Sequence, residues 1–277
     1  MKVHHEIESV RAAAVRAGND GATGLVPTMG GLHAGHLSLM RHSEAITGTT
    51  FATIFLNPTQ FAAGEDLDRY PQPIDDDLDR CREAGVAHVF VPKVSVMYPP
   101  GCSASVVPPS VANQLEGEHR AGHFAGVCTV VLKLFQVVPT THAFFGKKDY
   151  QQWRVLEAMV RDFNVNVEVV GCEIVRDFDG IALSTRNGYL DDDQRGRALS
   201  LSAGLNDARM AFRGGLHNAG DLENVLAKRL DVDRVDYVSV RDARTLERIE
   251  TVESDAVVLV AAHVGTTRLI DNVELLV

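Results

Sequence analysis

The stretch that decides the fold is VPTMGGLHAGH, residues 26–36. A short apolar run ends at Pro27, three glycines follow, and His33 and His36 lie three residues apart. Glycines let the backbone approach a ligand closely, and the first turn of a helix offers unpaired N–H groups to an anion. Histidines at i and i+3 project from one side of that turn, where each can donate to a phosphoryl oxygen and a cationic ring would stabilise developing charge. The stretch therefore predicts a strand, a phosphate-binding turn and a helix.

Other interpretations of the two histidines stay open. They could be exposed or cap the helix, or they could bind a metal, although no carboxylate lies nearby in the sequence. Two common phosphate loops do not fit. His36 and Leu37 follow Gly35 where a Walker loop has Lys and then Ser or Thr, and the dinucleotide pattern GxGxxG is absent.

Strand and helix patterns alternate on both sides of this stretch. The candidate strands are residues 24–26, 51–56, 86–91, 142–145 and 165–170, and the candidate helices are residues 35–45, 74–84, 126–138 and 150–163. Such alternation predicts an α/β protein with a Rossmann-like, doubly wound parallel sheet that helices cover on both faces. In sheets of this kind, ligands bind beyond the carboxyl ends of the strands.

The pattern changes after residue 176. Two candidate helices, 192–213 and 219–230, precede three candidate strands, 235–240, 256–264 and 269–276. Helices followed by a run of strands indicate a smaller C-terminal α+β domain. We therefore expect a Rossmann-like domain over residues 1–178 and a second domain over residues 179–277.

Composition excludes several classes of protein. The chain has 277 residues, 45% of them hydrophobic, and a net charge of −10 without a long basic stretch, which argues against a nucleic-acid partner. No apolar run reaches 18 residues and the N-terminus lacks the apolar segment of a signal peptide, so we expect no membrane association. The four cysteines are far apart, which favours a reducing cytoplasm.

Two further polar stretches follow predicted strands. Asn57 and Gln60 come after residues 51–56, and amides suit substrates with hydroxyl and carboxylate groups, although Asn57-Pro58 could be only a turn. Lys147 and Lys148 precede the helix 150–163, where the helix dipole disfavours cations. Two adjacent lysines there indicate a bound anion, unless both are solvated.

Hydroxyls and a guanidinium in Ser184-Thr185-Arg186 suit a triphosphate, or the segment forms a Ser/Thr turn at a domain junction. Arg120 and His123 lie in a glycine-containing loop before an apolar helix, and the simplest interpretation is a surface loop, with a metal-binding pair of His119 and His123 as a weaker alternative.

The motif HAGH, residues 33–36, resembles the HxGH signature of the nucleotidyltransferase superfamily. The longer string VPTMGGLHAGHLSL resembles one family within it, the pantothenate synthetases (pantoate–β-alanine ligases). Further stretches agree in the same order, namely IFLNPTQF (54–61), LEGEHRAGHFAGVCTVVLKLF (115–135), FFGKKDYQQ (144–152) and DGIALSTRNGYL (179–190), as does the tail LVAAHVGTTRLIDN. The resemblance covers essentially the whole chain.

The resemblance implies the roles of individual residues. The implied ATP-binding residues are Met29, Gly30, Gly31, Leu32, His33, Ala34, Gly35, His36, Gly146, Lys147, Lys148, Asp149, Val175, Leu183, Ser184, Thr185 and Arg186. The implied substrate-binding residues are Asn57, Gln60, Arg120, His123 and Gln152. The implied catalytic residues are His33, His36, Lys148 and Arg186, with His36 as the proton donor.

The family's reaction is a two-step ligation. The carboxylate of (R)-pantoate attacks the α-phosphorus of Mg-ATP to give pantoyl adenylate and pyrophosphate, and the amine of β-alanine then displaces AMP to form pantothenate. The resemblance also implies Mg²⁺ as a cofactor and a homodimer. The alternatives are a nucleotidyltransferase that stops at a nucleotide-linked product and a nucleotide-binding regulator without catalysis.

Some positions depart from the family pattern. Lys147 stands where the family usually has Glu, so its side chain either faces solvent or joins the phosphate site. Thr185 replaces a common Ser and keeps the hydroxyl. The run of aspartates at residues 75–77 is most simply the acidic first turn of a helix. Relatives have a Mg²⁺ position near this run, but Gln72 and Arg80 depart from their pattern, so we assign no residue to a metal site.

Overall fold

The computed structural model describes residues 1–62 and 64–277. Contacts divide the chain into two compact units. The N-terminal unit comprises Met1–Lys147 and Val155–Glu173, and the C-terminal unit comprises Lys148–Arg154 and Ile174–Val277. The predicted boundary between residues 178 and 179 stays a prediction.

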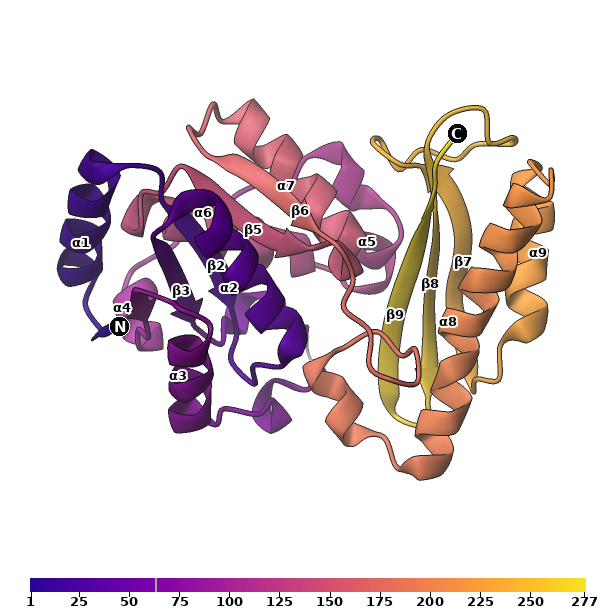
Figure 1. Cartoon of the computed structure of the whole chain (residues 1–277), viewed down its shortest axis with the longest axis horizontal. Coiled ribbons are helices and arrows are strands. Elements are labelled where there is room, and N and C mark those ends of the chain that lie inside the picture. The colour runs from indigo at the N-terminus through magenta and orange to yellow at the C-terminus, as the bar shows by residue number, and fades with distance from the viewer. Residues whose placement is uncertain (63) are drawn as a thin grey trace. The chain divides into compact units, whose positions relative to one another are not determined.

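The N-terminal unit is built on a parallel sheet of six strands (Figure 1). The strands are β1 (Lys2–His4), β2 (Gly24–Thr28), β3 (Thr50–Ile54), β4 (His88–Phe90), β5 (His142–Gly146) and β6 (Glu168–Cys172), in the spatial order β1-β4-β3-β2-β5-β6. All of their pairings are parallel. The predicted doubly wound α/β fold is confirmed.

Helices cover both faces of this sheet. They are α1 (Ile7–Asp20), α2 (Ala34–Thr47), α3 (Ile74–Glu83), α6 (His123–Val137) and α7 (Tyr150–Asp162), with the short α4 (Val94–Met97) and α5 (Glu116–His119) between α3 and α6. Neighbouring residues of a strand enter different cores, because side chains alternate across a sheet. Leu25 joins the core with α1 and α6, whereas Val26 joins the core with α2 and α3. This double coverage explains the nearly continuous apolar strands.

The strand order reverses between β2 and β5. From β2 the chain builds β3 and β4 on one side, and it then crosses to place β5 and β6 on the other side. β2 and β3 pair over five residues, but pairing between β2 and β5 covers only Gly24–His142 and Leu25–Ala143. The carboxyl-terminal residues of β2 and β5 are therefore not paired with each other, at the point where doubly wound sheets bind ligands.

The C-terminal unit contains an antiparallel sheet of β7 (Arg234–Asp242), β8 (Ala256–Val264) and β9 (Thr267–Leu275). Helices α8 (Asp192–Arg213) and α9 (Ala219–Arg229) share one apolar core with this sheet (Figure 1). Asp191 and Gln194 form a capping box at the start of α8. The predicted α+β character of this part is confirmed.

The elements that were not predicted include the edge strand β1, helix α1 and the short helices α4 and α5. β1 has only three residues, which is too short to show a period. α1 buries Val10, Ala13 and Ala14 at helical spacing, but alanines give a weak apolar signal, and no side chain caps the helix at Glu6. In the part of the chain that the structure describes, no helix is both long and apolar enough to cross a bilayer.

Two histidines at the β1–β4 edge predict how stability depends on pH. His4 is 2% exposed, its Nε2 lies 3.0 Å from Nδ1 of His88, and His88 stacks on Phe51. Burial, with a contribution from His88, lowers the pKa of His4 to about 4, and burial also lowers the pKa of His88. The unfolded chain therefore binds more protons below pH 6.5, and the free energy of unfolding should fall as the pH decreases from 6.5 towards 4.

We expect His4 to account for about 1–3 kcal/mol of this loss, because one unit of pKa corresponds to ~1.4 kcal/mol. Urea unfolding at several pH values measures this loss of unfolding free energy. His4→Asn should reduce the slope of the unfolding free energy against pH. His5→Asn, at an exposed position, should leave this slope unchanged. A slope that is the same in wild type and in His4→Asn would contradict this assignment.

Candidate active site

The glycine turn after β2 has the backbone conformation that its sequence predicts. Gly30 and Gly31 have φ values of 92° and 62°, in the left-handed region that favours glycine. The Thr28 hydroxyl donates to the carbonyl of Thr53 on β3 at 2.6 Å, which ties the end of β2 to its neighbour. The chain therefore reverses sharply before α2 begins.

His33 and His36 cap helix α2. Nδ1 of His33 accepts from the backbone N–H of Gly35 at 3.1 Å, and Nδ1 of His36 accepts from the backbone N–H of His33 at 3.2 Å. The two ring centroids are 4.1 Å apart. A backbone N–H can only donate, so each Nδ1 is unprotonated and the ring proton lies on Nε2. The capping interpretation is thus confirmed, and in this tautomer each ring carries its donor hydrogen on Nε2.

A buried carboxylate on α3 holds the glycine turn. Asp77 is 1% exposed and accepts from the backbone N–H groups of Gly31 at 2.9 Å and Leu32 at 2.7 Å. Burial raises the pKa of Asp77, although the two N–H donors oppose this rise. Asp77 is therefore more than part of an acidic first turn of helix.

Asn57 fixes the turn after β3, which contains the short 3₁₀ helix Pro58–Gln60. Oδ1 of Asn57 accepts from the hydroxyls of Thr59 and Tyr98, both at 2.9 Å. Nδ2 of Asn57 donates to Oε1 of Gln60 at 3.0 Å and to the carbonyl of Gly126 at 3.3 Å. Both hydrogens of this amide are thus used within the protein, so Asn57 acts as a support for Gln60.

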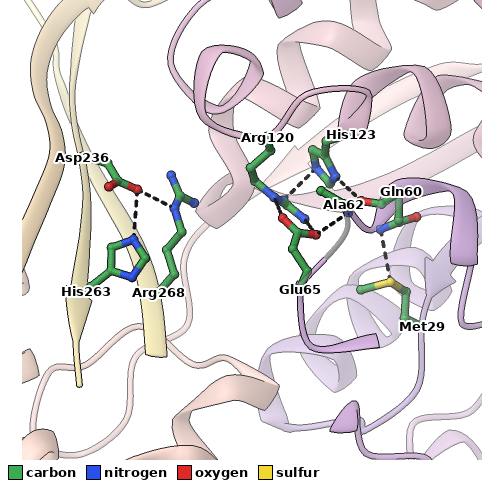
Figure 2. Close-up of polar contacts among 9 residues, drawn as sticks. All are labelled: Met29, Gln60, Ala62, Glu65, Arg120, His123, Asp236, His263 and Arg268. Carbon is green, nitrogen blue, oxygen red and sulfur yellow. Dashed lines mark hydrogen bonds and ion pairs between the residues drawn. The ribbon is translucent and has the colours of Figure 1, made fainter. Parts of the chain in front are cut away.

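Gln60 links the turns that follow β2 and β3. It is 9% exposed, and Nε2 donates to the sulfur of Met29 at 3.1 Å (Figure 2). Helix α6 packs closely on this segment because Gly126 has no side chain. A Cβ at Gly126 would overlap the carbonyl of Thr59 and lie 2.7 Å from the Cα of Gln60.

Arg120 and His123 contact the same segment (Figure 2). Arg120 donates from Nε to Oε1 of Glu65 at 2.7 Å, and its Nη1 lies 2.9 Å from Nε2 of His123. Nδ1 of His123 lies 2.8 Å from the carbonyl oxygen of Gln60. The structure therefore brings Met29, Asn57, Gln60, Arg120 and His123 into one hydrogen-bonded group.

Lys147 follows β5 and pairs with Glu173, with Nζ 2.6 Å from Oε1. The Lys147 side chain is only 16% exposed, so the interpretation that it faces solvent is wrong. Glu173, just after β6, supplies the partner, and nothing in the local sequence around Lys147 indicated this contact.

The remaining candidates lie in the C-terminal unit. The carbonyl of Lys148 accepts from Nδ2 of Asn272 at 3.0 Å, which ties the segment to β9. The backbone N–H of Leu183 donates to the carbonyl of Val175 at 3.0 Å. The hydroxyl of Ser184 accepts from the backbone N–H of Arg186, so the predicted turn at this segment is present. Asp149 lies in the 3₁₀ helix Lys147–Asp149, Gln152 in α7 and Thr185 in the 3₁₀ helix Thr185–Tyr189. Gln152 and Thr185 are half-buried.

The sheet of the C-terminal unit carries a separate ionic group (Figure 2). Oδ2 of Asp236 lies 2.8 Å from Nε of Arg268 and 3.2 Å from Nε2 of His263. Burial alone would raise the pKa of Asp236, but Arg268 and His263 outweigh it and hold this pKa below its usual range. The group joins β7, β8 and β9, and its role is structural.

In the described part of the chain, no three His, Cys, Asp or Glu side chains gather as they would around a metal ion. Mg²⁺ does not need such a group, because it commonly binds one or two carboxylates together with substrate phosphates and retains several waters. The residues present are therefore compatible with Mg²⁺ that is carried by a nucleotide.

The Asp77 contacts predict a stability effect. Asp77→Ala should lower the free energy of unfolding by roughly 2–4 kcal/mol, because two backbone N–H groups lose hydrogen bonds to a charged acceptor. Asp75→Ala is the control, since Asp75 is exposed on the same helix and its loss should cost at most about 1 kcal/mol. Urea unfolding compares the two variants. Equal losses of unfolding free energy in the two variants would contradict the conclusion that Asp77 holds the glycine turn.

Comparison with known proteins agrees with this geometry. The family model of pantoate-β-alanine ligase matches residues 2–274. The pantothenate synthetase of Rhodopirellula baltica is 51% identical over the full length of both chains. That of Mycolicibacterium smegmatis is 48% identical over 90% of this chain and 79% of its own.

Solved structures are similar as well. The crystal structure of pantothenate synthetase from Thermus thermophilus superimposes with a TM-score of 0.95 at 38% identity and covers both chains completely. The Francisella tularensis pantoate-β-alanine ligase, complexed with β-γ ATP and β-alanine, has a TM-score of 0.82 at 29% identity and covers 99% of this chain and 97% of its own. This chain belongs to the pantoate–β-alanine ligase family.

Proposed function

We propose that this chain ligates (R)-pantoate to β-alanine at the expense of ATP, through a pantoyl adenylate, and releases AMP and pyrophosphate. The observation that carries the proposal is the histidine-capped turn after β2, which lies where the strand order reverses and contacts Gln60 through Met29. An anion-binding turn thus lies beside a buried amide that can orient a hydroxy acid.

ATP binds to the turn at residues 29–36 and to the segment that follows β5. The Nε2–H groups of His33 and His36 donate to phosphate oxygens, since both Nδ1 atoms are occupied by caps. Gly146 and Lys147 continue this site in the N-terminal unit. In the C-terminal unit the family resemblance assigns Lys148, Ser184 and Arg186 to the phosphates, and it assigns Asp149, Val175, Leu183 and Thr185 to the rest of the nucleotide.

We assign pantoate to Gln60 of the N-terminal unit, and the family resemblance separately assigns Gln152 to this substrate. One N–H of Gln60 Nε2 donates to Met29, and among the described contacts its second N–H has no protein partner, so it can donate to the substrate. Asn57 acts indirectly by holding Oε1 of Gln60. Arg120 and His123 support the same side of the pantoate site.

The protein's chemical task is alignment and charge stabilisation. The carboxylate of pantoate is itself the nucleophile in the first step, and the amine of β-alanine is the nucleophile in the second. Aligning the two reactants removes much of the entropic barrier, and fixed donors stabilise the charge that moves onto pyrophosphate. His36 is better described as a hydrogen-bond donor than as the expected proton donor, because loss of Nε2–H from its neutral ring would leave an anion.

We further propose that Mg²⁺ enters with ATP and neutralises phosphate charge, as it does at many nucleotide sites. A homodimer and a cytoplasmic location are likewise proposals, the first from the family resemblance and the second from the dispersed cysteines. Size-exclusion chromatography with light scattering tests the dimer.

Lys148 provides one test of the ATP site. Lys148→Ala should lower turnover by roughly 10²–10³, the scale for removal of one electrostatic contact in a transition state. Steady-state kinetics at saturating ATP measures this. Lys228→Ala, which removes an exposed lysine of α9, should leave turnover unchanged. Normal turnover in Lys148→Ala would refute its assigned role.

The two-step scheme predicts partial reactions. With pantoate and Mg²⁺ but without β-alanine, the enzyme should exchange labelled pyrophosphate into ATP, because adenylation precedes entry of the amine. Omission of pantoate should abolish exchange. His36→Ala should depress exchange and overall ligation together, since both use the same phosphate contact.

Other outcomes of the exchange assay separate the alternatives. A nucleotide-binding regulator would show no exchange with any combination of substrates. A nucleotidyltransferase would show exchange only with another acceptor. Exchange that required β-alanine would exclude the stepwise scheme and favour a concerted reaction of three substrates.

A further inference from the structure

A chain of polar contacts runs from Glu65 to the backbone of Gln60 (Figure 2). The Arg120 guanidinium forms a bidentate pair with Glu65, through Nε to Oε1 at 2.7 Å and Nη2 to Oε2 at 2.9 Å. Its Nη1 contacts Nε2 of His123 at 2.9 Å, and Nδ1 of His123 contacts the carbonyl of Gln60 at 2.8 Å. All of these residues belong to the N-terminal unit.

The direction of every hydrogen bond in this chain is fixed. A guanidinium only donates, so Nε2 of His123 accepts and carries no proton. A carbonyl oxygen only accepts, so Nδ1 of His123 carries the proton and donates to Gln60. His123 is therefore neutral with its proton on Nδ1, the opposite tautomer to that of His33 and His36.

Burial and charge agree with this assignment. His123 is 6% exposed, and burial together with the Arg120 charge lowers its pKa to about 4. Burial alone would raise the pKa of Glu65, but the hydrogen bonds and charge of Arg120 outweigh it and hold that pKa below its usual range. Glu65 is thus ionised and His123 neutral at neutral pH.

We propose that Glu65 is a positioning residue for pantoate binding: it orients Arg120, which sets the tautomer of His123, and His123 fixes the backbone of Gln60. This inference rests on the proposed function in that it takes Gln60 to bind pantoate. Glu65 itself does not contact the substrate. It acts on Gln60 through two other side chains.

A purely stabilising role does not explain this arrangement. The Arg120 and Glu65 side chains are 16% and 23% exposed, so the pair is mostly buried, and the cost of desolvating both charges offsets much of their attraction. The Arg120 guanidinium nevertheless donates a third N–H to the buried ring of His123, and this ring contacts the backbone carbonyl of Gln60. Positional precision matters at such a residue, because a misplacement of about 1 Å can reduce a rate ~100-fold.

The first experiment is Glu65→Ala. The variant should fold, raise the KM for pantoate about 5- to 50-fold and leave the KM for ATP within about twofold, because only Gln60 is displaced. Ring ¹⁵N shifts of His123, assigned by loss of its signals in His123→Gln, should show a protonated Nδ1 in wild type and a mixture of tautomers in Glu65→Ala. The control Asp233→Ala removes a carboxylate from another half-buried arginine, Arg197, and should change neither readout.

A charge exchange separates positioning from stability. Glu65→Arg combined with Arg120→Glu can restore an ion pair, but a carboxylate at position 120 cannot donate to Nε2 of His123. We expect this double variant to recover thermal stability relative to the single variants without recovering the KM for pantoate. Recovery of both would show that the ion pair is only structural and would overturn the proposal.

The two readouts also keep this proposal distinct from the proposed function. If wild type forms no pantothenate, the proposed function fails, and the His123 shifts still decide whether Glu65 sets the tautomer. If wild type is active and Glu65→Ala leaves the KM for pantoate unchanged, the positioning role fails while the function stands. An unchanged tautomer in Glu65→Ala would also overturn the proposal.

Discussion

The candidate site depends on a carboxylate that is buried beneath the turn after β2. Asp77 accepts from the backbone N–H groups of Gly31 and Leu32, and these two bonds hold glycines with positive φ in place. Burying a carboxylate is costly unless hydrogen bonds compensate it. The raised pKa of Asp77 shows that burial remains the larger effect. Burial of the Asp77 carboxylate is thus locally unfavourable, but its hydrogen bonds fix the backbone from which His33 and His36 project.

A buried polar side chain also fixes the neighbouring turn after β3. Asn57 is 1% exposed and satisfies both of its amide hydrogens within the protein, so the residue has little freedom to respond to a ligand. Gln60 receives support from the Asn57 side chain at Oε1 and from His123 at its carbonyl. A flexible amide side chain held from two directions loses little additional entropy when a substrate binds. Rigidity at these two turns follows from the parallel sheet, which brings the carboxyl ends of β2 and β3 together.

Sequence patterns predicted the elements that bury a long apolar face. The predicted helix 192–213 matches α8 residue for residue, and the predicted strand 142–145 differs from β5 by one residue. The edge strand β1 was missed because three residues carry no period. The supporting contacts were missed for another reason, since they join distant positions: Asp77 lies 46 residues from Gly31, and Tyr98 lies 41 residues from Asn57. A local motif reveals a residue that meets the ligand, but it does not reveal the partner that holds that residue.

The capping hydrogen bonds also limit the charge that the rings of His33 and His36 can contribute. Protonation of Nδ1 in either ring would break a cap of α2, so the folded turn favours neutral imidazoles that donate through Nε2. Neutral donors align phosphate oxygens but supply no net charge. In the proposed reaction, positive charge on the phosphates is the proposed contribution of Mg²⁺, Lys148 and Arg186. His123 has the opposite tautomer because its Nδ1 faces a carbonyl and its Nε2 faces the Arg120 guanidinium. In each case the groups that face the ring nitrogens select the tautomer, and the tautomer selects the ring nitrogen that can donate.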